Sequence, residues 1–158
     1  MRFLMRWIVP FLLPFLLAWA TTFSLASIFQ TQFSINDLVI AGIDVSVQDR
    51  ISLSIQDWVG LAPTYGVIIG MGYLIIFSIA SLVCVKLKVC QRKLHVLLFS
   101  IAGMITISAI LVTLQPFLDA SLTANVGELS FYTQLLAGLC GGALFGTRHR
   151  LHHQPPVN

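Results

Sequence analysis

Charged side chains are scarce in this chain. Asp, Glu, Lys and Arg make up 9% of its 158 residues, and 57% of the residues are hydrophobic. Soluble domains contain about a quarter charged residues. An ordinary soluble globular protein is therefore excluded, and the composition indicates an integral membrane protein.

Reactive motifs are also missing. The three cysteines are Cys84, Cys90 and Cys140, and no two of them form a Cys-x-x-Cys pair, which excludes the usual disulfide-exchange motif. The sequence has no Gly-x-Ser-x-Gly motif of a serine hydrolase. We therefore expect that the protein is not an enzyme, with no catalytic residues and no cofactor.

Four hydrophobic runs are long enough to cross a bilayer, which takes about 20 mostly apolar residues. They cover residues 7–29, 63–85, 96–115 and 131–147. They predict an all-α fold in which four transmembrane helices form an antiparallel bundle, a single membrane domain over residues 1–158. Segments 1–6, 86–95 and 148–158 then lie on one side of the membrane, and segments 30–62 and 116–130 on the other.

None of the four runs contains Asp, Glu, Lys, Arg or His. Ionisable side chains within a membrane are the usual markers of proton relays, ion paths and substrate sites. Small four-helix multidrug exporters need a carboxylate there, and four-helix glutathione-transferase-like membrane enzymes use buried Arg and Glu. This absence argues against a self-contained carrier and against such an enzyme.

The basic and acidic residues are distributed on opposite sides of the membrane. Eight of the nine basic residues lie in segments 1–6, 86–95 and 148–158, whereas all six acids lie in the other two connections with Arg50. The positive-inside rule predicts that both termini are cytoplasmic. We expect a multi-pass protein of the plasma membrane, in a bacterium the inner membrane. The net charge of +3 then belongs to a collar at the lipid headgroups, and we expect no nucleic-acid partner.

The last run carries glycines at every fourth position, Gly138, Gly142 and Gly146. On a helix they form one bare flank, which lets a second helix approach closely, and close approach over small residues is a main source of helix association in lipid. Two interpretations stay open: the flank is the tightest seam inside the bundle, or it binds a partner subunit.

Two other runs repeat the pattern. The second contains Gly66 and Gly70, and the third carries small residues at spacings of three and four, Ala102, Thr106 and Ala109. Three of the four predicted helices thus have a face suited to near contact. A tight bundle follows.

The segment between the first two runs can be interpreted in two ways. As a helix, Ser46 is a plausible N-cap, and Ile51, Ile55 and Trp58 fall on one face that can lie on the membrane surface or at the bundle mouth. As a β-hairpin, residues 43–47 and 51–55 alternate with period two. We favour the helix, because an isolated two-stranded ribbon is only marginally stable.

Polar residues inside the runs are few. Tyr73 and Thr106 fall near the midplane, where a phenol hydroxyl needs a partner, while Gln134 lies close enough to the outer surface for water to reach it. The tail histidines His149, His152 and His153 could join His95 or Cys90 around a metal, but their spacing is too weak to predict a metal site.

These observations favour a small membrane protein that acts by helix packing, as an accessory or assembly subunit or as a homo-oligomer. Its partners would be the lipid bilayer and either another membrane protein or a second copy. The alternative is a small channel or transporter whose pathway forms between protomers.

Overall fold

The computed structural model describes residues 2–86, 91–114 and 128–151, and within them every regular element is a helix. Four of the helical stretches are long and apolar enough to cross a membrane. The predicted all-α bundle of four membrane helices is confirmed. The elements are α1 (Arg2–Ile40), α2 (Val47–Leu61), η1 (Ala62–Gly66), α3 (Val67–Lys86), α4 (Arg92–Leu114) and α6 (Glu128–Leu151).

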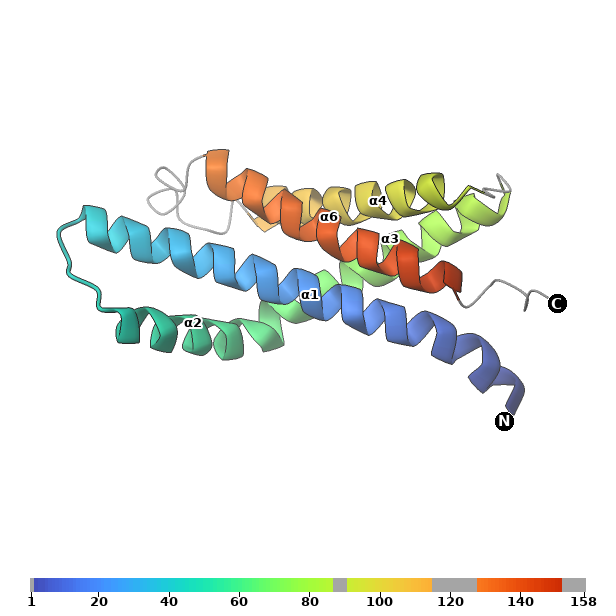
Figure 1. The fold of residues 1–158 in the computed structure, drawn as a ribbon, viewed down its shortest axis with the longest axis horizontal. Coiled ribbons are helices and arrows are strands. Elements are labelled where there is room, and N and C mark those ends of the chain that lie inside the picture. Colours follow the sequence, from blue (N-terminus) through green and yellow to red (C-terminus); the bar gives the residue numbers. More distant parts are fainter. Residues whose placement is uncertain (1, 87–90, 115–127, 152–158) are drawn as a thin grey trace.

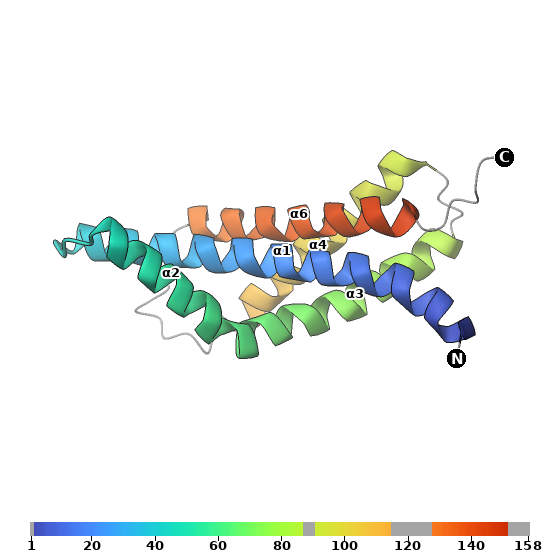
Figure 2. The same ribbon diagram turned by 60° about the horizontal axis from the view of Figure 1, so that its bottom comes forward.

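Helix α6 is central to the bundle. It packs against α1 and against α4, while α3 packs mainly against α4 and α2 packs against α1 (Figures 1 and 2). Consecutive membrane helices run in opposite directions (Figure 1). We call the end that contains Lys86, Arg92 and Arg148 the basic end, and the end where α1 finishes and α2 begins the acidic end.

Helix α1 continues past the predicted span, from Phe29 to Ile40. Its last turn closes at Gly42, which has a φ of 85°. The Gly42 amide donates to the Val39 carbonyl at 3.0 Å, and the Ile43 amide donates to the Leu38 carbonyl at 3.0 Å. This pair of bonds is the Schellman motif, which uses the left-handed conformation that glycine adopts without strain.

Helix α2 confirms the helical interpretation of the segment after α1. Its N-cap is Ser46, whose hydroxyl accepts a hydrogen bond from the Asp49 amide at 3.2 Å. The helix returns alongside the outer part of α1, and Thr31 donates to the Asp57 carboxylate at 2.9 Å. The two helices form a hairpin that extends beyond the start of α6 (Figure 1). We call it the α1–α2 hairpin.

Pro63 does not separate α2 from α3. The helix runs from Val47 to Lys86 and passes through a π-helical turn, η1, that contains this proline. A proline has no N–H to donate and its ring clashes with the preceding turn. The wider π turn takes up this clash without ending the helix.

An aromatic cluster fills the core toward the basic end. Phe77 of α3, Phe99 of α4 and Phe145 of α6 are all fully buried. The ring centroid of Phe77 is 4.5 Å from that of Phe145 and 5.6 Å from that of Phe99. The cluster joins three helices at one level.

Candidate helix-packing site

The glycine flank of α6 lies against α4 inside the chain. Gly138, Gly142 and Gly146 are all buried. A Cβ atom built on Gly138 would stand 2.7 Å from the Gly103 carbonyl oxygen, and one on Gly146 would stand 3.0 Å from the Val96 Cα atom. A Cβ on Gly142 would meet the backbone of Phe99. Any larger residue would push the two backbones apart.

A second face of α6 lies against α1. Ala137 is fully buried, and a Cβ on Gly141 would stand against the Thr22 hydroxyl and 2.9 Å from the Ala18 carbonyl oxygen. Two neighbouring flanks of α6 are therefore covered by two helices of the same chain.

Three short polar contacts cross the bundle at this level, and they share the two hydroxyl hydrogens of Tyr73 and Thr22. The Tyr73 hydroxyl lies 2.6 Å from the Thr22 hydroxyl and 3.2 Å from the Gly138 carbonyl oxygen, and Thr22 donates to the Ala137 carbonyl at 3.3 Å. Both side chains are fully buried. Helices α1, α3 and α6 are joined by these polar groups in an apolar surrounding, where an unpaired hydroxyl is costly.

The glycines of the second run hold a tryptophan of α1. Gly66 is buried and its carbonyl oxygen accepts a 2.6 Å hydrogen bond from the Trp19 indole. A Cβ built on Gly70 would stand 3.3 Å from the Trp19 Nε1 atom. Both glycines therefore leave room for the indole ring.

The predicted small residues of α4 do not all lie in the interior of the bundle. Ala102 and Thr106 are buried, and the Thr106 methyl group would lie 2.7 Å from a Cβ on Gly72 of α3. Ala109 is exposed. The glycine of α4 that meets α6 is Gly103, which sequence reasoning missed because a single glycine on α4 forms no spaced pattern.

A polar cluster lies between α1 and α6 nearer the acidic end. Gln134 donates to the Ala26 carbonyl at 3.1 Å, and its side chain is 2% exposed. The expectation that water reaches Gln134 from the surface is therefore wrong, since α1 covers it. Ser27 is 1% exposed. Neither its hydroxyl nor the Gln134 amide oxygen has a hydrogen-bond partner within the described part of the chain.

Two histidines meet near the basic end. The ring of His95 lies parallel to that of His149, with centroids 6.0 Å apart, and the His95 Nδ1 atom is 3.1 Å from the Gly146 carbonyl oxygen. Within residues 2–86, 91–114 and 128–151 no three His, Cys, Asp or Glu side chains form a group able to hold a metal. His152, His153 and Cys90 lie outside the described residues.

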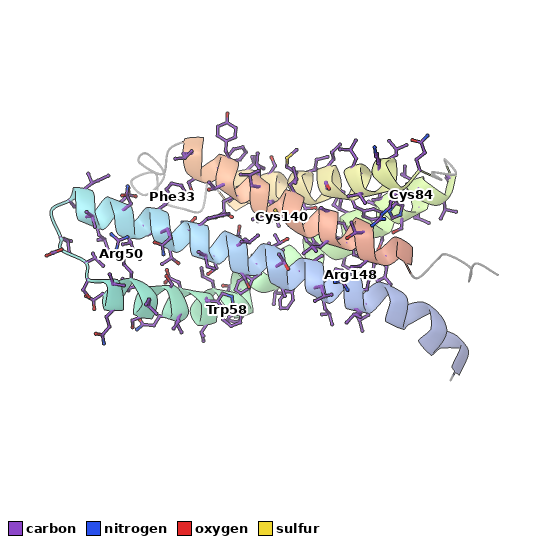
Figure 3. All side chains as sticks on the ribbon, viewed as in Figure 1. Phe33, Arg50, Trp58, Cys84, Cys140 and Arg148 are labelled. Carbon is purple, nitrogen blue, oxygen red and sulfur yellow. The ribbon has the colours of Figure 1, made fainter. Side chains whose placement is uncertain are left out.

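The three residues of α2 that the sequence placed on one apolar face are exposed. Ile51 is 58%, Ile55 60% and Trp58 44% exposed. The Trp58 indole donates to the Ser24 hydroxyl at 3.2 Å and its ring centroid is 5.6 Å from that of Phe23. Figure 3 shows Trp58 on α2, toward the bundle. Trp58 thus lies at the junction of the bundle and the hairpin, while Ile51 and Ile55 lie farther along the hairpin.

No protein-family model, no curated protein and no solved structure matches this chain in comparisons by sequence and by fold.

Proposed function

We propose that this protein is a non-enzymatic accessory protein that acts by binding another membrane component through the exposed apolar side of its α1–α2 hairpin. It is a multi-pass protein of the plasma membrane, in a bacterium the inner membrane. The basic end and both termini are cytoplasmic and the hairpin is extracytoplasmic, because eight of the nine basic residues lie in segments 1–6, 86–95 and 148–158.

The packing of α6 supports this choice of surface. Its flanks at Gly138, Gly141 and Gly142 already contact α4 and α1 of the same chain. A partner that used these glycines would have to displace a helix of the bundle. A partner therefore binds a surface other than the glycine flanks of α6.

The observation that carries the proposal is the direction in which α2 presents its side chains. Toward α1 it turns Ser54 and Asp57, which bond Gln32 and Thr31. Four of its apolar residues stay exposed, at 74% for Val47, 58% for Ile51, 60% for Ile55 and 60% for Val59. Large exposed apolar patches mark surfaces that bind another protein or a membrane, because water solvates them poorly.

The experiment compares two doubly charged variants in native membranes. Ile51→Asp with Ile55→Asp charges the apolar side of the hairpin, and the matched control Ser34→Asp with Asn36→Asp adds the same charge at exposed positions of α1. We expect chemical cross-linking of the wild type and of the control to give a complex larger than the chain. The first variant should give the monomer, with an unchanged circular dichroism spectrum. A wild-type chain that stays monomeric, or a complex that survives in the first variant, would refute the proposal.

A further inference from the structure

We infer that the apolar side of α2 binds α2 of a second copy of this chain, so that the protein is a two-fold symmetric dimer with its axis along the membrane normal. The inference rests on the proposed function and names the partner. Its surface is the α2 stripe, defined as Val47, Ile51, Ile55 and Val59.

The aromatic residues locate the edge of the lipid. Trp58 of α2 and Tyr132 of α6 are exposed, at 44% and 57%. Trp58 contacts α1 at Ser24, and Gln134, half a turn from Tyr132, contacts α1 at Ala26. The two aromatic side chains thus lie at about the same height. Exposed Trp and Tyr collect at the membrane–water interface.

Most of the α2 stripe lies beyond this edge. Helix rise is about 1.5 Å per residue, which puts Ile51 about 10 Å and Val47 about 16 Å past Trp58. A headgroup layer is about 5–8 Å thick. In this placement Val47 and Ile51 lie past the lipid, and a protein partner would shield them from water.

The charges on α2 argue against an anionic surface as the partner. Its one basic residue, Arg50, is half-buried, and the helix also carries Asp49 and Asp57. Helices that lie on anionic lipid carry several Lys and Arg on the polar face. An anionic membrane surface or a nucleic acid would therefore find no cluster of basic residues on α2.

The uncharged border of the stripe suits an identical partner. Beside it lie Gln48, Ser52 and Gln56, all exposed. At a two-fold axis each residue meets its own counterpart, so any charge near the axis would face a like charge. A different protein would impose no such limit. A stripe and border without charge are what self-association requires.

The membrane orients two copies for this contact. Both copies insert the same way, so their α2 stripes stand at equal height. Below the hairpin, α3 exposes Val67, Met71 and Ile75 to the lipid, at 56%, 61% and 55%. A stable interface buries roughly 800 Å² per partner, so a dimer contact that begins at the α2 stripe would have to include these α3 residues as well.

The test uses cysteine cross-linking between two differently tagged copies expressed together, with Cys84, Cys90 and Cys140 replaced by Ala. Ile55→Cys lies on the stripe. Ser54→Cys is the matched control, because Ser54 faces Gln32 of α1. In native membranes a short bismaleimide should join Ile55→Cys chains into a product that carries both tags, and Ser54→Cys should give at least tenfold less.

Each other outcome overturns the dimer. Equal cross-linking of Ser54→Cys and Ile55→Cys would mean random collision. An Ile55→Cys product that carries one tag and a different protein would overturn the dimer and leave the proposed function standing. No product at Ile55→Cys, together with a monomeric wild type in the charged-variant experiment, would overturn both.

Discussion

Gly138 of α6 and Gly103 of α4 meet backbone to backbone, because a Cβ on Gly138 would stand 2.7 Å from the Gly103 carbonyl oxygen. This contact brings the two helices together without an intervening side chain on either. Dispersion contacts and close approach replace the hydrophobic drive that lipid does not supply. The seam between α4 and α6 should therefore be the part of the protein least tolerant of added volume.

The first prediction concerns Gly142→Ala. The new methyl group would meet the Phe99 backbone, which cannot move away as a side chain could. We expect a loss of about 1–3 kcal/mol in the free energy of unfolding, the usual cost of overpacking. This loss should appear although alanine is a better helix former than glycine by about 1 kcal/mol.

Gly60→Ala is the control, since Gly60 lies in α2 with nothing within 4 Å of an added Cβ. It should leave the stability unchanged or raise it by up to about 1 kcal/mol. Reversible unfolding in mixed micelles would measure both variants. If Gly142→Ala is as stable as Gly60→Ala, the backbone contact between α4 and α6 does not exist as described.

The second prediction concerns the buried hydroxyl of Tyr73. Tyr73→Phe keeps the ring and removes the bonds to Thr22 and to the Gly138 carbonyl. Hydrogen bonds between membrane helices contribute about 0.6 kcal/mol on average and up to about 1.7 kcal/mol. We expect a loss in that range from unfolding curves. Tyr132→Phe, at a 57% exposed position, should change little, and equal losses in the two variants would contradict the assigned role.

The sequence defines the membrane helices better than the faces by which they pack. Long apolar runs, sorted charges and the Ser46 N-cap each have a local physical cause, and the predicted four-helix bundle and the α2 helix follow from them. Helices such as α3 and α6 are apolar on nearly every side, so their hydrophobic pattern does not reveal which side is inward. Only the assembled bundle pairs Gly103 with Gly138.

Two further structural features, the role of Thr22 and the contact of α1 with α2, could not be predicted from local sequence patterns. Thr22 is one of several small polar residues in an apolar run, and its burial and its contacts with Tyr73 and Ala137 distinguish it from its neighbour Thr21. The part of α1 that continues to Ile40 is joined to α2 by the Thr31–Asp57 bond, which no local pattern predicts. Both are contacts between residues far apart in the sequence.

The third prediction tests the α1–α2 hairpin through Thr31→Val. Valine keeps the shape of threonine and removes the hydroxyl that donates to the half-buried Asp57 carboxylate. A net hydrogen bond is worth about 1 kcal/mol. Hydrogen exchange of the α2 amides should therefore become about fivefold faster, while exchange in α6 stays the same.

The control for the hairpin is Thr113→Val, because exposed Thr113 donates to the Ala109 carbonyl of its own helix. Thr113→Val should leave the hydrogen-exchange rate of the α2 amides unchanged. An unaltered α2 exchange rate in Thr31→Val would show that the hairpin is held by its other contacts alone.

The last prediction concerns the orientation in the membrane. Gln48 and Gln91 are both exposed, Gln48 in the first turn of α2 at the acidic end and Gln91 just before α4 at the basic end. The distribution of Lys and Arg puts the basic end in the cytoplasm. In chains whose native cysteines are replaced, an impermeant maleimide added to intact cells should label Gln48→Cys and leave Gln91→Cys unlabelled. After the cells are permeabilised, both should react, which controls for accessibility of the thiol. Labelling of Gln91→Cys alone in intact cells would invert the topology, and it would place the α2 stripe on the cytoplasmic side, where its partner would then have to be sought.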